Sequence, residues 1–148
     1  MEENIEKNPE ECAEYWAIMF FTHLNNEDRI SAWNLLSENS QNKLIDDIYN
    51  EIQTNQTVDE ESKEISKEHI KTAFENDYPG ITRAFWKGFT EASFVKAIVQ
   101  YATFQIVEEI DNGIVLEINF KFSDEKEISF PLKMRKENDT WKIAYFEA

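Results

Sequence analysis

Hydrophobic positions change their spacing along this 148-residue chain, and the change falls between residues 90 and 101. Upstream, apolar residues recur every three or four positions, as on one face of an α-helix. From Tyr101 onward they alternate with polar residues, as in a β-strand that buries one face. Helices followed by an antiparallel meander predict an α+β fold, with N-terminal helices packed on a curved antiparallel sheet of four or more strands.

Five helical segments are predicted before the change. Asn8 and Pro9 suit the first positions of a helix, which we expect to end near Leu24. Its middle is apolar on all sides, so this helix should be central or lie in an oligomer interface. The polar segment 53–61 is a candidate mobile loop. The other helices are expected over residues 27–36, 41–52, from 62 to the Pro79-Gly80 breaker, and 81–89.

Four strands are predicted after the change. The first lies within residues 96–110, and a tight turn with Asn112-Gly113 follows, because Asn-Gly favours hairpins. Pro131 cannot donate a backbone hydrogen bond and therefore marks an edge or a bulge. The inward side chains are expected to be Ile114, Leu116, Ile118, Phe120 and Phe122 on the second strand, Ile128, Phe130, Leu132 and Met134 on the third, and Trp141, Ile143 and Tyr145 on the fourth.

Three short motifs fit this order of elements, namely Asn25-Asn26-Glu27-Asp28, Ala32-Trp33-Asn34-Leu35-Leu36-Ser37 and Lys136-Glu137-Asn138-Asp139-Thr140-Trp141-Lys142-Ile143. With them the chain resembles the NTF2-like superfamily, which includes ketosteroid isomerase, scytalone dehydratase and SnoaL-type cyclases. The length of 148 residues predicts a single domain over 1–148, and the resemblance makes it an NTF2-like one. The resemblance also implies a cone-shaped sheet around a mostly apolar cavity, often with dimerisation through the outer sheet face. Segment 62–89 is longer than the family's minimal pattern and is a candidate helical insertion or lid.

The chain carries 30 acidic and 15 basic residues, which gives a net charge of −15. Residues 1–80 hold 19 of the acids and 6 of the bases, so most of the excess lies in the helical half. Phosphates would be repelled, which argues against DNA, RNA and anionic membranes as partners. A basic protein partner remains open, beside the simpler interpretation of an acidic, solvated surface.

Cysteine and histidine are scarce. Cys12 is alone, and His23 and His69 are too far apart to form a metal-binding pattern with it. No nucleotide-binding or nucleophile motif is present, so neither a metal nor a cofactor is expected. The N-terminus lacks the apolar stretch of a signal peptide, and no apolar run is long enough to span a bilayer. We therefore expect a cytoplasmic location without membrane contact.

The resemblance to ketosteroid isomerase indicates which residues to consider for catalysis. That chemistry needs an acid/base carboxylate in an apolar cavity and a neutral donor for an enolate oxygen. Glu108 and Tyr15 are the nearest candidates, because alternation places Glu108 on one face with Phe104 and Ile106. His23 is a third candidate, as a base. Each has a simpler interpretation: a solvated strand end, a core aromatic residue, and a histidine at a helix C-terminus.

Aromatic side chains either line a pocket for a flat apolar ligand or pack a solid core. The candidates for ligand contact are Trp16, Phe20, Trp33, Phe104 and Phe120. We expect non-enzymatic binding of a small apolar ligand or a protein partner, with a homodimer as a candidate state. One alternative is a cofactor-free isomerase, dehydratase or cyclase. Another is an acidic interaction or inhibitor protein that binds a basic partner in a salt-sensitive way.

Overall fold

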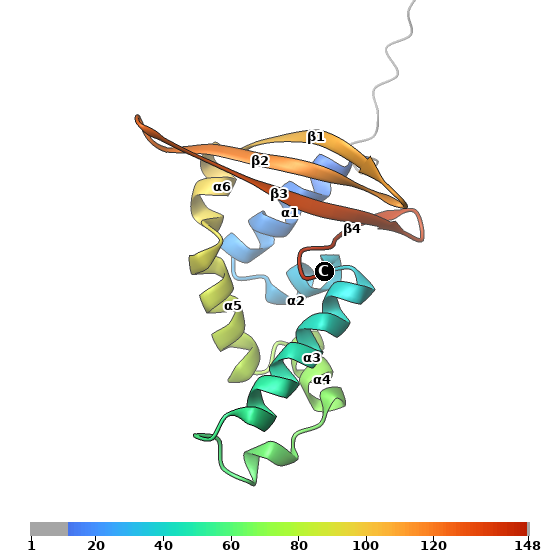
Figure 1. Cartoon of the computed structure of the whole chain (residues 1–148), viewed down its shortest axis with the longest axis vertical. Helices are drawn as coiled ribbons and strands as arrows, with labels where there is room; N and C mark the ends of the chain where they lie inside the picture. The colour runs from blue at the N-terminus through green and yellow to red at the C-terminus, as the bar shows by residue number, and fades with distance from the viewer. Residues whose placement is uncertain (1–11, 148) are drawn as a thin grey trace, which may run out of the picture.

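The computed structural model describes residues 12–147, except for the side chain of Phe122, and confirms the α+β class (Figure 1). The predicted helix start at Asn8 and Pro9 lies outside the described residues. The elements are α1 (Ala13–Asn25), α2 (Arg29–Leu35), α3 (Glu38–Thr54), the 3-10 turn η2 (Ser62–Glu64), α4 (Lys67–Asn76), α5 (Ile81–Ala92), α6 (Val95–Tyr101), β1 (Thr103–Ile110), β2 (Gly113–Ser123), β3 (Lys126–Glu137) and β4 (Thr140–Ile143).

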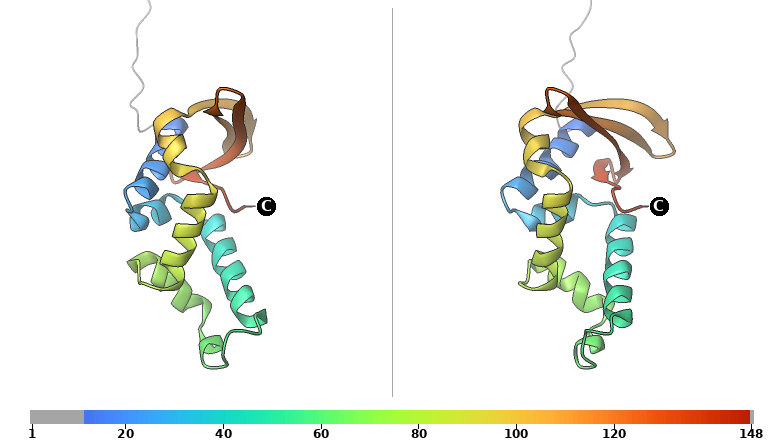
Figure 2. Two further views of the ribbon diagram at one scale, coloured as in Figure 1. Left: turned by 90° about the vertical axis from the view of Figure 1, so that its left-hand side faces the viewer. Right: turned by 60° about the vertical axis from the view of Figure 1, so that its left-hand side comes forward.

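The sheet follows the chain order β1-β2-β3-β4, and each neighbouring pair is antiparallel. It arches over α1, and the helices lie on one side of it, with α3 and α4 extending away from the sheet (Figures 1 and 2). Ile114, Leu116, Ile118 and Phe120 of β2 are buried, as their alternation predicts. One face of the sheet is therefore covered by helices and the other faces solvent.

Two tight turns are built from left-handed residues. Asn112 (φ 58°) lies between β1 and β2, and Asn138 and Asp139 (φ 52° and 64°) connect β3 to β4. Asparagine and aspartate adopt this conformation more readily than other residues with a side chain. Gly113 is the first residue of β2 and has no positive φ. This glycine is therefore not required for a left-handed backbone.

A close approach of two strands requires Gly113. A Cβ atom at this position would collide with the backbone carbonyl oxygen of Met134 on the neighbouring strand β3. Gly88, in the exposed middle of α5, has open space around the position where its Cβ would lie. The two glycines therefore differ in what an added methyl group would meet.

We predict opposite effects for alanine at these two positions. Gly113→Ala should lower the free energy of unfolding by about 2 kcal/mol, because β2 and β3 must separate to admit the methyl group. Gly88→Ala should raise it by roughly 0.5–1 kcal/mol, because alanine favours the helix. Urea unfolding followed by circular dichroism measures both values. Equal effects of the two substitutions would contradict the close approach at Gly113.

Helix α6 is the main element that the sequence pattern did not predict. It occupies part of the range in which the first strand was expected, and β1 begins only at Thr103. Val95, Ile98 and Val99 are three and four positions apart, which is a helical spacing, and the first two are buried. A helix of only seven residues directly before a strand is easily taken for part of that strand.

The fourth strand is shorter than predicted. β4 ends at the buried Ile143, and Tyr145 lies beyond it, 36% exposed, with its ring 5.0 Å from that of Phe89. Because β4 pairs with β3 only from Met134 onward, this side of β3 is unpaired at Pro131. The edge position predicted for Pro131 is therefore confirmed.

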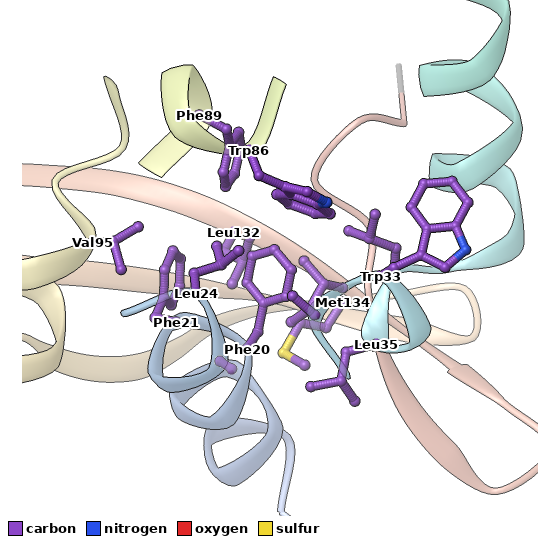
Figure 3. Packing of buried hydrophobic residues seen from close by; sticks show 14 of the residues in the cluster. Phe20, Phe21, Leu24, Trp33, Leu35, Trp86, Phe89, Val95, Leu132 and Met134 are labelled. Carbon is purple, nitrogen blue, oxygen red and sulfur yellow. The ribbon is translucent and has the colours of Figure 1, made fainter. Parts of the chain in front are cut away.

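Aromatic rings fill the interior beneath the sheet (Figure 3). The ring of Phe20 on α1 lies 6.5 Å from that of Trp86 on α5, which lies 6.1 Å from Phe74 on α4. Phe74 stacks on Trp33 of α2, with ring centroids 4.4 Å apart. All four rings are at most 2% exposed. This row of rings joins the core under the sheet to the helices that extend from it.

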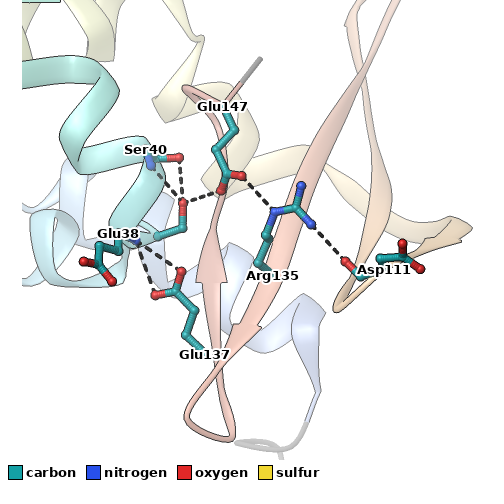
Figure 4. A network of polar contacts seen from close by, with 7 residues as sticks. Glu38, Ser40, Asp111, Arg135, Glu137 and Glu147 are labelled. Carbon is teal, nitrogen blue, oxygen red and sulfur yellow. Dashed lines mark hydrogen bonds and ion pairs between the residues drawn. The ribbon is translucent and has the colours of Figure 1, made fainter. Parts of the chain in front are cut away.

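The chain after β4 returns to the start of α3. Ile143 forms a parallel bridge with Leu36, and its carbonyl oxygen accepts a hydrogen bond from Ser37 N at 2.8 Å. Ser37 Oγ donates to the Glu147 carboxylate at 2.6 Å, and Arg135 Nε donates to it at 2.8 Å (Figure 4). We call these contacts the C-terminal clasp. They fix the N-cap residue of α3.

The clasp keeps Glu147 ionised. Its side chain is only 7% exposed, and this burial acts to raise its pKa. Hydrogen bonds from Ser37 and Arg135, together with the positive charges of Arg135 and Lys133, outweigh burial. The pKa of Glu147 therefore lies below its ordinary value.

Glu147 should contribute stability that is lost in acid. Because its pKa is lower in the folded than in the unfolded chain, the contribution is complete above the unfolded value of about 4.3 and disappears as the pH falls through the folded pKa. Near neutral pH, Glu147→Gln should lower the free energy of unfolding by about 1–2 kcal/mol. Urea unfolding across the acid range should show this difference shrinking below about pH 4.

The control for this experiment is Glu51→Gln, which changes an exposed carboxylate of α3 whose side chain has no hydrogen bond or ion pair with a described residue. Near neutral pH this variant should differ from the parent protein by less than about 0.5 kcal/mol, because the side chain is exposed. A difference between Glu147→Gln and the parent that stays constant into acid would show that the carboxylate charge does not stabilise the clasp.

Candidate functional site

The three residues predicted for catalysis lie apart. Tyr15 is in the first turn of α1, where its ring meets that of Trp16 edge-on at 5.0 Å. His23 is in the last turn of the same helix, with Nδ1 3.6 Å from an Asp28 carboxylate oxygen. Glu108 is exposed on β1. The structure does not bring these side chains to a common point, and none of them lines the two cavities described below.

The predicted face of Glu108 is wrong, because β1 contains a bulge. Ile106 pairs with the inward-facing Leu116 of β2, as alternation predicts. The register then shifts, and Glu108 pairs with Val115, which points to the other face. One inserted residue moves every later side chain of the strand to the opposite face. Glu108 therefore lies on the solvent side of the sheet.

The five aromatic residues predicted for ligand contact belong to the core or its margin. Phe20, Trp33 and Phe120 are at most 2% exposed, and Trp16 and Phe104 are partly buried against the same core. Phe104 lines a hollow of about 70 Å³, well below the volume of typical ligand sites. Cavities of ligand size lie elsewhere, on the flank of the helices.

A cavity of about 440 Å³ lies between the α1–α2 connection and α5. Arg29 at the start of α2 lines it, as do Arg83 and Lys87, one turn apart on α5. We call it the cationic cavity. The left view of Figure 2 faces this side of the molecule, where α1 and α2 lie beside α5 and α6. Its other lining residues are Leu24, Asn25, Glu27, Trp86, Thr90 and Glu91.

Asp77 positions the two arginines. Its Oδ1 accepts a hydrogen bond from Arg29 Nε at 2.9 Å and lies 3.7 Å from Arg83 Nε. Asp77 is the C-cap of α4 with φ 51°, a left-handed conformation that aspartate tolerates. Its hydrogen bond raises the pKa of Arg29 above the ordinary value. Asp77 therefore offsets one positive charge and fixes the place of two.

A second cavity, of about 420 Å³, adjoins the first along the end of α5 and α6. Asn25, Thr90 and Glu91 line both cavities. We call the second one the α6 groove. Beyond the shared residues its walls are mostly apolar, and they consist of Phe94, Val95, Lys96, Ala97, Gln100 and Tyr101.

Phe94 gives the α6 groove an unusual backbone. It is the N-cap of α6 and has a left-handed conformation, with φ 56°, which costs a bulky L-residue about 1–2 kcal/mol. Its side chain is 41% exposed, and its ring lies 5.8 Å from that of the buried Phe120. The chain therefore holds a strained residue where α5 meets α6 and where the groove has its wall.

Sequence reasoning missed the cationic cavity. Its cations come from α2 and α5, which are separated along the chain by α3 and α4, so no local motif contains them. One signal was available, because Arg83 and Lys87 are four positions apart in a predicted helix and so share one face. Arg83 and Lys87 lie near Arg29 because of how α5 packs beside α2, and the sequence pattern does not specify that packing.

Comparison with protein-family models, with characterised proteins and with solved structures found no match. The resemblance to the NTF2-like superfamily and the homodimer therefore stay predictions. Among the described residues, no group of three or more His, Cys, Asp and Glu side chains is arranged to hold a metal ion. Within residues 12–147, no helix is long and apolar enough to cross a membrane.

Asp77→Asn tests the link between α4 and the two arginines. Asparagine keeps the left-handed backbone but removes the charge, so the free energy of unfolding should fall by about 1 kcal/mol. Breaking the exposed pair of Lys43 and Asp47 with Lys43→Gln should cost less than about 0.5 kcal/mol, since both side chains are about half exposed. Urea unfolding measures both variants, and equal losses would contradict a positioning role for Asp77.

Proposed function

We propose that the chain is a non-enzymatic binding domain whose ligand places an acidic group in the cationic cavity. The observation that carries this proposal is the convergence of Arg29, Arg83 and Lys87 on one cavity of a chain with a net charge of −15. Ligand binding was expected from the sequence, and the filled interior supports a ligand on the flank of the helices rather than inside the sheet.

The donors available in the cavity suit an oxyanion. Arg29 engages Asp77 through Nε, and its two Nη groups make no hydrogen bond with any described residue. Lys87 has no ion pair within the described part of the chain. Guanidinium groups bind carboxylate and phosphate oxygens through pairs of N–H donors, and an ammonium adds a mobile point charge. Because Asp77 already orders the arginines, less conformational entropy is lost on binding.

The acids in the same cavity limit the strength of this interaction. Glu27 and Glu91 are also lining residues, and Asp77 lies beside both guanidinium groups. The three acids balance the three cations in formal charge, so the cavity is locally neutral on a chain with a net charge of −15. We expect a bare anion to bind weakly and in a salt-sensitive way, so a physiological ligand needs further contacts.

The sequence left two alternative functions open, a cofactor-free enzyme and an acidic protein that binds a basic partner. For an isomerase, dehydratase or cyclase, Glu108, Tyr15 and His23 do not form a joint acid/base site. The acidic protein that binds a basic partner stays a prediction, and salt-sensitive association with such a partner is its test. The cationic cavity favours ligand binding.

A titration with inorganic phosphate, followed by the backbone amide resonances of the protein, tests the proposal. We expect shifts concentrated at the start of α2 and along α5, with a dissociation constant on the order of 1 mM. Lys87→Ala should weaken binding about five- to tenfold, because it removes one charge-assisted hydrogen bond. Raised sodium chloride should weaken it as well.

The matched control is Lys71→Ala, which removes an exposed lysine of α4 that lines neither cavity. It should leave phosphate binding unchanged. Resonance shifts scattered over many surface lysines, or equal effects of the two alanine variants, would indicate nonspecific ion binding and would overturn the proposal.

A further inference from the structure

We infer that the ligand is a single-chain anionic amphiphile, with its acidic head in the cationic cavity and its aliphatic chain along the α6 groove. This inference rests on the proposed function, because it requires the anion site. It adds the chemistry of the rest of the ligand and the place where that part lies.

The two cavities are adjacent. Asn25, Thr90 and Glu91 line both of them, so a ligand that occupies both lies across these three residues, and the two cavities together give it one path. Each cavity alone falls in the range of known small-molecule sites, with about 440 Å³ for the first and 420 Å³ for the second. A ligand that fills only the first leaves the second open to water.

The far end of this path is apolar and incompletely covered. Tyr101 is 67% exposed and Phe94 is 41% exposed, and both line the α6 groove together with Val95 and Ala97. Single exposed aromatic side chains are common, whereas a group of them along one groove indicates a binding surface. Burying apolar area there provides the additional contacts that the weak anion site requires.

The distribution of polar groups favours an aliphatic chain over a peptide. A peptide backbone needs a hydrogen-bonding partner at each residue that it buries. Past the shared residues, the polar groups of the groove are the side chains of Lys96 and Gln100 and the hydroxyl of Tyr101, too few to pair with a buried peptide backbone. A neutral apolar ligand would in turn give no acceptor to Lys87 or to the two Nη groups of Arg29, which Asp77 does not engage. An acidic head on a hydrocarbon chain satisfies both ends of the path.

Two homologous series test this assignment, n-alkyl phosphates from ethyl to decyl and n-alkanoates of matching length, each at concentrations where the compounds are monomeric. Isothermal titration calorimetry measures their affinities. We expect about two- to fourfold tighter binding for each methylene group that enters the groove, until the chain extends beyond Tyr101. Comparable gains in both series support an acidic head in general, and gains in one series identify which head the cavity prefers.

Two variants test whether the aliphatic chain of the ligand lies in the α6 groove. Tyr101→Ser should weaken binding of decyl phosphate about fivefold and leave ethyl phosphate unchanged. Its control is Tyr78→Ser, since Tyr78 is 52% exposed and lines neither cavity; this variant should bind both compounds as the parent does. Thermal unfolding of each variant confirms that the fold is retained, which is expected for exposed side chains.

The outcomes separate the two proposals. Equal affinity for ethyl and decyl phosphate, with the Lys87 dependence intact, would overturn the amphiphile and leave the anion-binding function standing. No binding of any phosphate or alkanoate would overturn both. A chain-length effect that Tyr101→Ser does not alter would overturn the assignment to the α6 groove. Decanol binding as tightly as decyl phosphate would overturn the role of the acidic head.

Discussion

The packing of Trp86 is the interaction on which the rest of this structure depends. Its ring is 2% exposed and contacts Phe20 beneath the sheet and Phe74 on α4. The same residue forms part of the wall of the cationic cavity. Because protein interiors are packed as densely as organic crystals, this one side chain sets the position of α5 relative to the sheet, and α5 carries Arg83 and Lys87. Trp86 thus belongs both to the hydrophobic core and to the wall of the candidate site.

A filled core also explains where the space for a ligand lies. Phe20, Trp33 and Phe120 are buried in the core, and the two ligand-sized cavities lie outside it, at the α1–α2 connection and where α5 meets α6. Arg29 and Arg83 meet in the cationic cavity because the cap of α4, Asp77, lies between them. The partly buried carboxylate of Asp77 thus holds two cations together on an otherwise acidic surface.

Local periodicity made the sheet and most helices predictable, and long-range pairing decided the rest. The alternation in β2 is visible in the sequence because buried positions carry apolar residues and exposed positions carry polar ones. The bulge before Glu108 is not, since it exists only in the pairing of β1 with β2. Helix α6 was hidden because seven helical residues run directly into a strand. The cationic cavity needs residues from α2 and α5 to meet, and nothing in either segment encodes the other.

The C-terminal clasp has a consequence for the order of folding. Ser37 and Glu147 are 110 positions apart in the chain, and Lys142 donates to the carbonyl oxygen of Asn34 across 108 positions. Contacts of such separation form slowly, because closing a long loop costs entropy before any contact compensates for it. The helices are local and can form early. Because Glu147 follows β4, we expect the N-cap of α3 to receive its carboxylate partner only after β3 and β4 have paired, so the clasp should form late in folding.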